Sequence, residues 1–279
     1  MVDIVRVGTD QNSLSLCASV LRAAFPRATR FSPEYLRWQY ADNPVGSIVG
    51  FNAVSVEGTL AAHYVCLPIV ASIEGVLESG LLSLNTATHP DHQGKGLFTK
   101  LAQATYALGL ALGYSFVVGV ANQNSTGGFV RKLGFELVSP LDAKIGIGPL
   151  HLSSPRQDLG FRRHWDERTL RWRLSNPAAT YAVTGSVISC ATDRPLINAI
   201  IGTSAFTSQL QTPRSSRAPF HLWIGRDPAV EAGHNYFYMD IPKRFRPSPL
   251  NFIFLDLSGA GRRLNASRLA FWAVDFDAY

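Results

Sequence analysis

Cysteine is scarce in this 279-residue chain, which contains only Cys17, Cys66 and Cys190. Their odd number and wide spacing exclude a disulfide framework and favour a reducing compartment. The opening stretch MVDIVRVGTD also lacks the basic-then-apolar pattern of a signal peptide. We therefore expect a cytoplasmic protein.

A long apolar run is missing as well. The most apolar stretch, residues 106–121, is shorter than a membrane span and is interrupted by Gly109, Gly113 and Ser115. It is better explained as a helix end followed by a buried strand. Since 46% of the residues are hydrophobic and only 16% are charged, the chain can bury a substantial core, and no membrane partner is expected.

The few charges are unevenly spread. Residues 1–150 carry ten basic and ten acidic residues, whereas residues 151–279 carry sixteen and ten, so the whole net charge of +6 lies in the second half. A solvated basic surface and a bound anionic ligand explain this excess equally well. The arginines at 162–173 form no recognisable nucleic-acid motif, so nucleic acid is not expected as a partner.

Residues 1–150 alternate between strand and helix patterns. Thr9 or Asp10, and Ser32 followed by Pro33, predict the starts of two helices. Strands are expected at 2–7, 48–56, 59–67, 70–75, 80–88 and 114–121, and helices at about 10–25, 33–43, 97–112 and 125–133. This order predicts an α/β domain in which antiparallel strands lead into a parallel pair.

The second half begins with a repeat. The stretch YLRWQYADNP at 35–44 has a counterpart in TLRWRLSNP at 169–177. Both contain Leu-Arg-Trp, end in Asn-Pro and precede a strand-like stretch, which indicates a duplication. Residues 150–165 have the proline and glycine content of a linker. We therefore expect one domain at 1–150 and a second, related α/β domain at 151–279.

A glycine-rich loop follows the strand expected at 80–88 and precedes the helix expected at 97–112. The chain has no Gly-x4-Gly-Lys-Ser/Thr string of a P-loop, and Thr99 stands where a Rossmann fingerprint needs glycine. Glycine lets the backbone approach a phosphate, and the free amides of a helix start attract one. Lys95 adds a positive charge. The loop therefore predicts a pyrophosphate site, with a turn that binds no ligand as the alternative.

The stretch LNTATHPDHQGKGLFTKLA resembles the coenzyme A-binding motif of the GNAT N-acetyltransferases, Gln/Arg-x-x-Gly-x-Gly/Ala, and VANQNSTGGFVRKLGF at 120–135 is similar to the strand, turn and helix end that follow it. The resemblance covers about residues 1–150 and implies a GNAT fold, a mixed central sheet flanked by helices. Together with the repeat, it implies a degenerate second GNAT-like domain that shapes the acceptor cleft.

The resemblance also implies which residues bind acetyl-CoA as cosubstrate. In the family, loop amides hold the pyrophosphate, the end of the preceding strand pairs with the pantetheine arm, and the second turn touches that arm. The corresponding residues here are Gln93, Gly94, Lys95, Gly96, Leu97 and Phe98 in the loop, Thr86, Ala87 and Thr88 in the strand, and Asn122 and Ser125 at the turn.

Two departures concern the loop and the catalytic acid. Phe98 replaces the last small residue of the motif, so its ring must point away from the phosphates. Val130 stands where many relatives place a tyrosine that protonates the leaving thiolate, which leaves Ser125, a water or no dedicated acid. An amine acceptor also needs a base. His63 and Asn85 are candidates, although a core histidine and an amide that only orients the acceptor or a water are the alternatives.

Two further features carry less weight. His89 and His92 lie close in sequence but have no other ligand cluster, so no metal is expected. A second glycine loop at 256–265 has Asp256 where the first has Gln93, and a carboxylate there would repel phosphate. We expect an ordinary turn and therefore one coenzyme site per chain.

These features together predict an acetyl-CoA-dependent N-acetyltransferase that acts on the primary amine of a small molecule. An amino sugar or a nucleotide-linked amino sugar is favoured by analogy with proteins of bacterial polysaccharide loci. An anionic acceptor would explain Arg171 and Arg173, and so would salt bridges within a helix. The alternatives are a non-catalytic acetyl-CoA sensor or scaffold, and an aminoacyl or acyl transferase with tandem GNAT-like halves.

Overall fold

A computed structural model describes residues 2–153, 158–204, 206, 218–231, 233, 235–246 and 248–277. The first half contains β1 (Val2–Arg6), α1 (Gln11–Ala24), α2 (Pro33–Tyr40), β2 (Val49–Ser55), β3 (Leu60–Ile73), β4 (Val76–Thr88), α3 (Leu97–Ala111), β5 (Phe116–Ala121), α4 (Gln123–Leu133), β6 (Glu136–Pro140) and β7 (Asp142–Ile147). The second half contains β8 (Phe161–Arg163), α5 (Glu167–Leu174), β9 (Tyr181–Thr184), β10 (Val187–Ala191), β11 (Ile197–Thr203), β12 (Phe220–Arg226), α6 (Pro228–Glu231), β13 (Tyr238–Asp240), β14 (Asn251–Asp256) and β15 (Leu269–Trp272). None of the helices in these residues is long and apolar enough to span a bilayer.

The predicted helix starts are confirmed. The Asp10 side chain accepts hydrogen bonds from Asn12 N and Ser13 N at the start of α1, and Ser32 accepts one from Tyr35 N at the start of α2, whose first residue is Pro33. These caps satisfy amides that a helix cannot pair internally. The fourth helix begins at Gln123, two residues earlier than predicted, because Asn122 caps it.

The strands predicted at 59–67 and 70–75 are one strand, β3, and its partner β4 begins at Val76 rather than at residue 80. Pro68 does not interrupt β3 because it lies between the segments that pair with β2, up to Cys66, and with β8, from Ala71 onward. A proline there removes no ladder hydrogen bond. The predicted turn at Glu74 and Gly75 connects the two strands.

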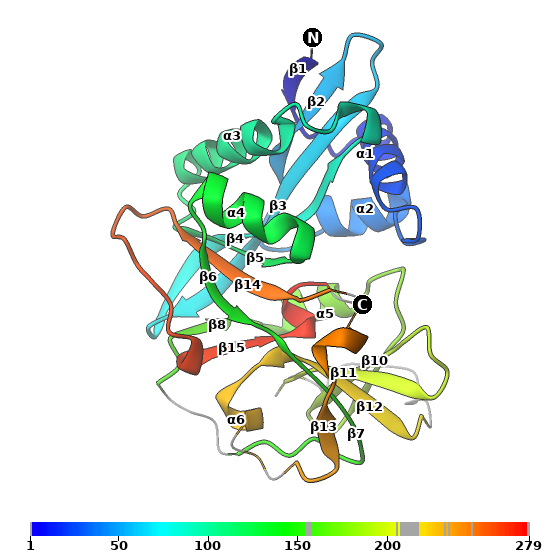
Figure 1. Ribbon diagram of the computed structural model, residues 1–279, viewed down its shortest axis with the longest axis vertical. Helices are drawn as coiled ribbons and strands as arrows, with labels where there is room; N and C mark the ends of the chain where they lie inside the picture. Colours follow the sequence, from blue (N-terminus) through cyan, green and yellow to red (C-terminus); the bar gives the residue numbers. More distant parts are fainter. Residues whose placement is uncertain are drawn as a thin grey trace.

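The central sheet is mixed and flanked by helices, as predicted (Figure 1). Strands β1 to β4 pair antiparallel, and β4 pairs parallel with β5, which confirms the predicted parallel pair. Helices α1 and α2 pack against one face of the sheet, where Leu14 and Leu36 share a core with Leu67 of β3. Helices α3 and α4 cover the other face with Leu101 and Phe129.

The two halves of the chain share strands. Strand β14 lies antiparallel between β5 and β6, although it follows them by more than a hundred residues. Strand β15 pairs with β12 of the second half and with β8, which in turn pairs with β3. The sheet therefore continues from one half into the other. The division into domains 1–150 and 151–279 stays a prediction.

Candidate active site

The glycine loop leaves the start of α3 open. Gly94 and Gly96 have φ angles of 75° and 73°, in the left-handed region that favours glycine. Gly96 is the N-cap of α3, so no side chain caps the first amides of this helix. A Cβ atom built on Gly96 would meet nothing within 4 Å. Free amides, a bare backbone and the positive end of a helix together form an anion-binding arrangement.

The strand before the loop has a free edge beside it. Strand β4 pairs with β5 only through Leu81, Leu82 and Ser83, and the ladder ends at Ser83 and Gly119. Its pairing with β3 is irregular between His63 and Val65, opposite Asn85, whose φ angle is 48°. Residues 84–88 of β4 therefore form no ladder with β5. Such an edge can pair with an extended ligand.

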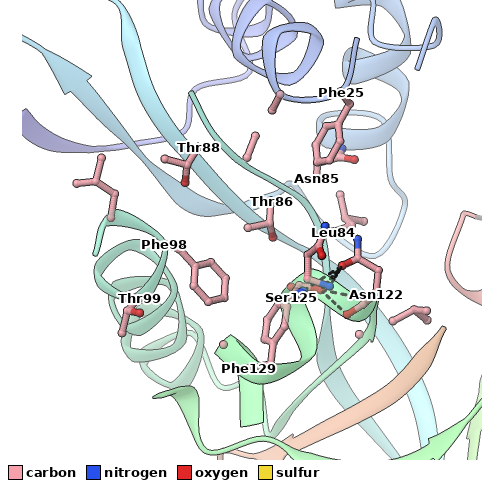
Figure 2. Close-up of a pocket in the computed structure, with 18 of the residues that line it drawn as sticks. Phe25, Leu84, Asn85, Thr86, Thr88, Phe98, Thr99, Asn122, Ser125 and Phe129 are labelled. Carbon is pink, nitrogen blue, oxygen red and sulfur yellow. Dashed lines mark hydrogen bonds between the residues drawn. The ribbon is translucent and has the colours of Figure 1, made fainter. Parts of the chain in front are cut away.

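A single pocket of about 1020 Å³ joins the loop, the free edge and the start of α4, and we call it the central pocket. It contains every residue that the sequence predicted for coenzyme binding: Thr86, Ala87, Thr88, Gln93, Gly94, Lys95, Gly96, Leu97, Phe98, Asn122 and Ser125. Figure 2 shows the β4 residues on one side and Phe98, Ser125 and Phe129 on the other. The coenzyme roles of these residues remain part of the proposal below.

The Phe98 ring belongs to an aromatic cluster. Its centroid lies 5.2 Å from that of Phe129 and 5.9 Å from that of Tyr64, in edge-on contacts. This packing leaves the Phe98 amide at the start of α3, although the side chain is large. The replacement of the small motif residue is therefore compatible with an anion site.

Asn122 and Ser125 cap α4 and face the central pocket. Asn122 Oδ1 accepts hydrogen bonds from the amides of Asn124 and Ser125, each at 3.0 Å, and Ser125 Oγ accepts one from Asn122 N at 3.0 Å. Ser125 Oγ also donates to Asn122 Oδ1 at 3.1 Å. The hydroxyl proton is thus directed to the cap rather than offered to a ligand. Val130, at the position of the expected tyrosine, does not line the pocket.

His63 lies outside the central pocket and is only 1% exposed. Its Nε2 is 2.9 Å from Tyr40 Oη and its Nδ1 is 2.6 Å from Asn52 Oδ1. Burial lowers the pKa of His63 to about 3. The structure therefore places this candidate base in a buried hydrogen-bond chain, away from any position where it would contact a substrate.

Asn85 does line the central pocket, together with residues that the sequence analysis missed. Phe25, Arg30 and Phe31 come from the connection between α1 and α2, and Asp277 comes from the end of the described chain. Gln39 joins Asp277 to Asn85 through its amide. No local pattern marks these residues, because the contact between Gln39 and Asp277 spans 238 positions.

The arginines suggested for an anionic acceptor have other partners. Arg171 pairs with Glu167, one turn earlier on α5, at 2.6 Å. Arg173 is 2% exposed and pairs with Asp277 at 3.3 Å. Neither lines the central pocket. The explanation by structural salt bridges therefore accounts for both side chains.

The second glycine loop is held by its own carboxylate. Asp256 accepts hydrogen bonds from the amides of Ser258 and Arg262 and from the Arg262 guanidinium. Burial raises the pKa of Asp256, but these hydrogen bonds outweigh it and lower the pKa to about 2. An anionic carboxylate in this position supports the interpretation as an ordinary turn. Among the described residues, no group of three His, Cys, Asp or Glu side chains is placed to hold a metal ion.

The family model described as an acetyltransferase (GNAT) domain matches residues 9–138, which run from the start of α1 into β6 and contain the loop and most residues that line the central pocket. Residues 9–138 are a GNAT acetyltransferase domain. The predicted family and the enzyme class, an acyltransferase, are confirmed.

Several solved structures share the fold over nearly the whole chain. A GCN5-related N-acetyltransferase from Anabaena variabilis matches with a TM-score of 0.60 and 12% identity, over 91% of this chain and 73% of that protein. Eis1 from Mycobacterium abscessus matches with a TM-score of 0.58 and 11% identity, over 92% and 74%. The N-myristoyltransferase of Saccharomyces cerevisiae, solved with myristoyl-CoA, matches with a TM-score of 0.56 and 8% identity, over 91% and 82%. No curated protein matches in sequence.

Proposed function

We propose that this GNAT protein transfers the acetyl group of acetyl-CoA to the primary amine of a small molecule. The observation that carries this proposal is the uncapped start of α3 beside the free edge of β4, both in the central pocket. The loop amides of residues 93–98 suit a pyrophosphate, and the backbone of Thr86 to Thr88 suits an extended pantetheine arm. The pocket of about 1020 Å³ is large enough for both substrates.

The transfer needs little covalent chemistry from the protein. The amine nitrogen forms a bond to the acetyl carbon, the carbon–sulfur bond breaks, and coenzyme A leaves as a thiolate. A backbone amide at the open edge of β4 is suited to stabilise the oxygen charge that develops on the acetyl carbonyl. His63 is buried and Ser125 directs its proton to Asn122. We therefore propose that the amine gives its proton to water and that the thiolate leaves without a protein acid.

We assign the acceptor to the end of the central pocket that Phe25, Arg30 and Phe31 line. These side chains suit an amino sugar with an anionic group, such as a nucleotide-linked amino sugar. Phe25 and Phe31 provide apolar rings there, and the exposed Arg30 guanidinium lies 5.1 Å from the centroid of the Phe31 ring. A guanidinium suits a phosphate or carboxylate because it presents several donors in one plane. Arg30 takes the role that Arg171 and Arg173 cannot fill.

Thiol release tests the proposal. The protein is incubated with acetyl-CoA and a panel of amino sugars, nucleotide-linked amino sugars, amino acids and polyamines, and free coenzyme A is followed. Calorimetric titration with acetyl-CoA is run on the wild type, on Gly96→Glu and on Gly58→Glu as the matched control. Gly58 also has a positive φ, 78°, but lies in a turn outside the pocket. We expect binding and release in the wild type and control, and loss of both in Gly96→Glu, whose carboxylate repels the pyrophosphate.

One alternative has an observation in its favour. Neither His63, Ser125 nor Val130 offers an acid or base to a bound substrate. This fits a protein that binds acetyl-CoA without turnover, as a sensor or scaffold. Acetyl-CoA binding that Gly96→Glu abolishes, with no thiol release across the panel, would favour this function. Absence of binding in the wild type would contradict both.

A further inference from the structure

A series of hydrogen-bonded side chains connects Asp277, near the end of the described polypeptide, to Asn85 in the central pocket. Asp277 Oδ2 accepts a hydrogen bond from Gln39 Nε2 at 2.7 Å and another from Tyr35 Oη. Gln39 Oε1 accepts one from Asn85 Nδ2 at 2.5 Å. Asn85 Nδ2 also donates to Tyr40 Oη at 3.0 Å. Gln39 and Tyr35 are each 1% exposed, so the middle of this series of hydrogen bonds is shielded from water.

Asp277 determines which group donates and which accepts in each of these hydrogen bonds. A carboxylate oxygen only accepts hydrogen bonds, and the other oxygen of Asp277 pairs with the Arg173 guanidinium at 3.3 Å. Gln39 must therefore turn its NH2 group toward Asp277 and its carbonyl oxygen toward Asn85. Asn85 must then turn its own NH2 group toward Gln39. One carboxylate thus decides the orientation of two amide groups, either of which would otherwise be free to flip.

The hydrogen bonds beyond Asn85, at Tyr40, His63 and Asn52, are consistent with this assignment of donors and acceptors. Tyr40 Oη accepts from Asn85, so its own proton is free for His63 Nε2, 2.9 Å away. His63 Nδ1 then carries the ring proton and donates it to Asn52 Oδ1 at 2.6 Å. Burial keeps His63 neutral, with one ring proton, because its pKa is about 3. Every donor in the chain from Asp277 to Asn52 therefore meets an acceptor.

The orientation leaves one polar atom of Asn85 for a ligand. Both hydrogens of its NH2 group are used by Gln39 and Tyr40, and no donor among the described residues reaches Oδ1. Asn85 is half-buried, lines the central pocket and sits at the irregularity of β4 next to the open edge. A carbonyl oxygen that no described residue pairs with is, at this point, an acceptor for an N–H group of a ligand.

We propose that Asn85 Oδ1 is the docking point for the primary amine of the acceptor, and that Asp277 and Gln39 are positioning residues that orient it. This rests on the proposed transfer to an amine. An ammonium or amine group donates hydrogen bonds, so it fits Oδ1 and would face repulsion from an NH2 group in the flipped orientation. A polar site that pairs with the right group rejects its opposite because a buried donor is left unpaired.

The amide orientation is tested without any substrate. A joint X-ray and neutron structure of the wild-type protein, exchanged into D2O, shows which end of each amide carries deuterium. We expect deuterium on the Asn85 side-chain atom that contacts Gln39 and Tyr40, and none on the other terminal atom of the amide. The reverse orientation would overturn the proposal, whatever the enzyme acetylates.

The docking role is tested by kinetics with ethylamine, a minimal acceptor, in the thiol-release assay. Gln39→Leu removes the hydrogen bonds that the amide forms with Asp277, Asn85 and Tyr35, and we expect the KM for ethylamine to rise about tenfold with an unchanged KM for acetyl-CoA. Tyr35→Phe removes a hydrogen bond to Asp277 and the 3.2 Å hydrogen bond from Gln39 Nε2, but leaves the Gln39 amide paired with Asp277 and Asn85, so both KM values stay within about twofold. In an Asn85→Ala background, Gln39→Leu should have no further effect.

Two kinetic outcomes would contradict the proposal. Equal rises of both KM values in Gln39→Leu would show a general structural role and no docking by Asn85. Undiminished, additive effects of Gln39→Leu in the Asn85→Ala background would show that Gln39 acts elsewhere. If the wild type releases no thiol with ethylamine or any amine of the panel, the proposed transfer fails and the docking role with it, while the neutron structure still decides the amide orientation.

Discussion

The indoles of Trp38 and Trp172 exchange hydrogen bonds: Nε1 of each donates to the backbone carbonyl of the other at 2.9 Å. Their rings stack with centroids 5.1 Å apart. The two residues occupy the same position of the Leu-Arg-Trp repeat, on α2 and on α5. The repeated segments therefore face each other through equivalent atoms, which supports the duplication inferred from the sequence.

We expect substitutions of Trp38 and Trp172 to have coupled effects on the free energy of unfolding. Trp172→Phe leaves the buried carbonyl of Trp38 without its donor, and we expect a loss of about 1–3 kcal/mol beyond the loss of ring area. Because the two bonds connect the same two segments, Trp38→Phe combined with Trp172→Phe should cost less than the two single changes together. Urea unfolding of the four proteins measures the coupling.

Trp223→Phe is the matched control for the tryptophan pair. Trp223 is fully buried, and its Nε1 has no hydrogen-bond partner within the part of the chain that the structure describes. This change removes ring area but no hydrogen bond. A loss for Trp172→Phe no larger than that for Trp223→Phe would show that the exchanged hydrogen bonds contribute nothing.

Stability should decrease in acid because of His63. Its pKa is about 3 in the folded protein and about 6.5 when exposed, so between these values the unfolded chain binds a proton that the folded chain refuses. This contribution is fully present above pH 6.5 and falls by about 1.4 kcal/mol for each pH unit below it. Urea unfolding at pH 7.5, 5.5 and 4.5 measures the slope.

His63→Gln serves as the reference for that slope, since acidic groups also titrate in this range. Burial raises the pKa of Asp227 and of Asp275, which has the opposite effect on stability in acid. The difference between wild type and variant isolates the histidine. Parallel pH profiles for the two proteins would mean that His63 is protonated as easily when folded as when unfolded.

Ser125→Ala should affect stability more than catalysis. Ser125 completes the cap of α4, and the loss of a cap costs about 1 kcal/mol. Its hydroxyl proton is directed to Asn122, and we expect kcat within about threefold of the wild type, against the 100-fold or larger loss typical of a removed acid. Ser32→Ala, at the cap of α2 and outside the pocket, is the control. A kcat loss of the larger size, with unchanged acetyl-CoA affinity, would identify Ser125 as the acid.

Arg30 should set the preference for anionic acceptors. Arg30→Gln is expected to raise the KM of a phosphorylated amino sugar about tenfold relative to the unphosphorylated form, because one charge-assisted contact is lost. Arg27→Gln removes a neighbouring exposed charge that does not line the pocket and should leave this ratio unchanged. The ratio of KM values for glucosamine 6-phosphate and glucosamine measures the effect. Equal ratios in all three proteins would remove Arg30 from the acceptor site.

Local features of the chain were predictable from the sequence. The caps at Asp10 and Ser32 and the loop around Gly96 depend on neighbouring residues, and the structure places them as expected. The continuity of β3 through Pro68 was not predictable, because it depends on where two other strands stop pairing. The link between Gln39 and Asp277 likewise depends on tertiary packing, which leaves no periodic pattern in the sequence.

The position of β14 has a consequence for biosynthesis. A ribosome delivers β5 and β6 long before it delivers β14, which separates them in the finished sheet. Until residues 251–256 emerge, both earlier strands keep an unpaired edge, and such edges recruit other chains. The wall of the central pocket that β5 provides is therefore completed only after most of the polypeptide has left the exit tunnel. Nascent chains that stop early should be substrates for chaperones rather than partially active enzymes.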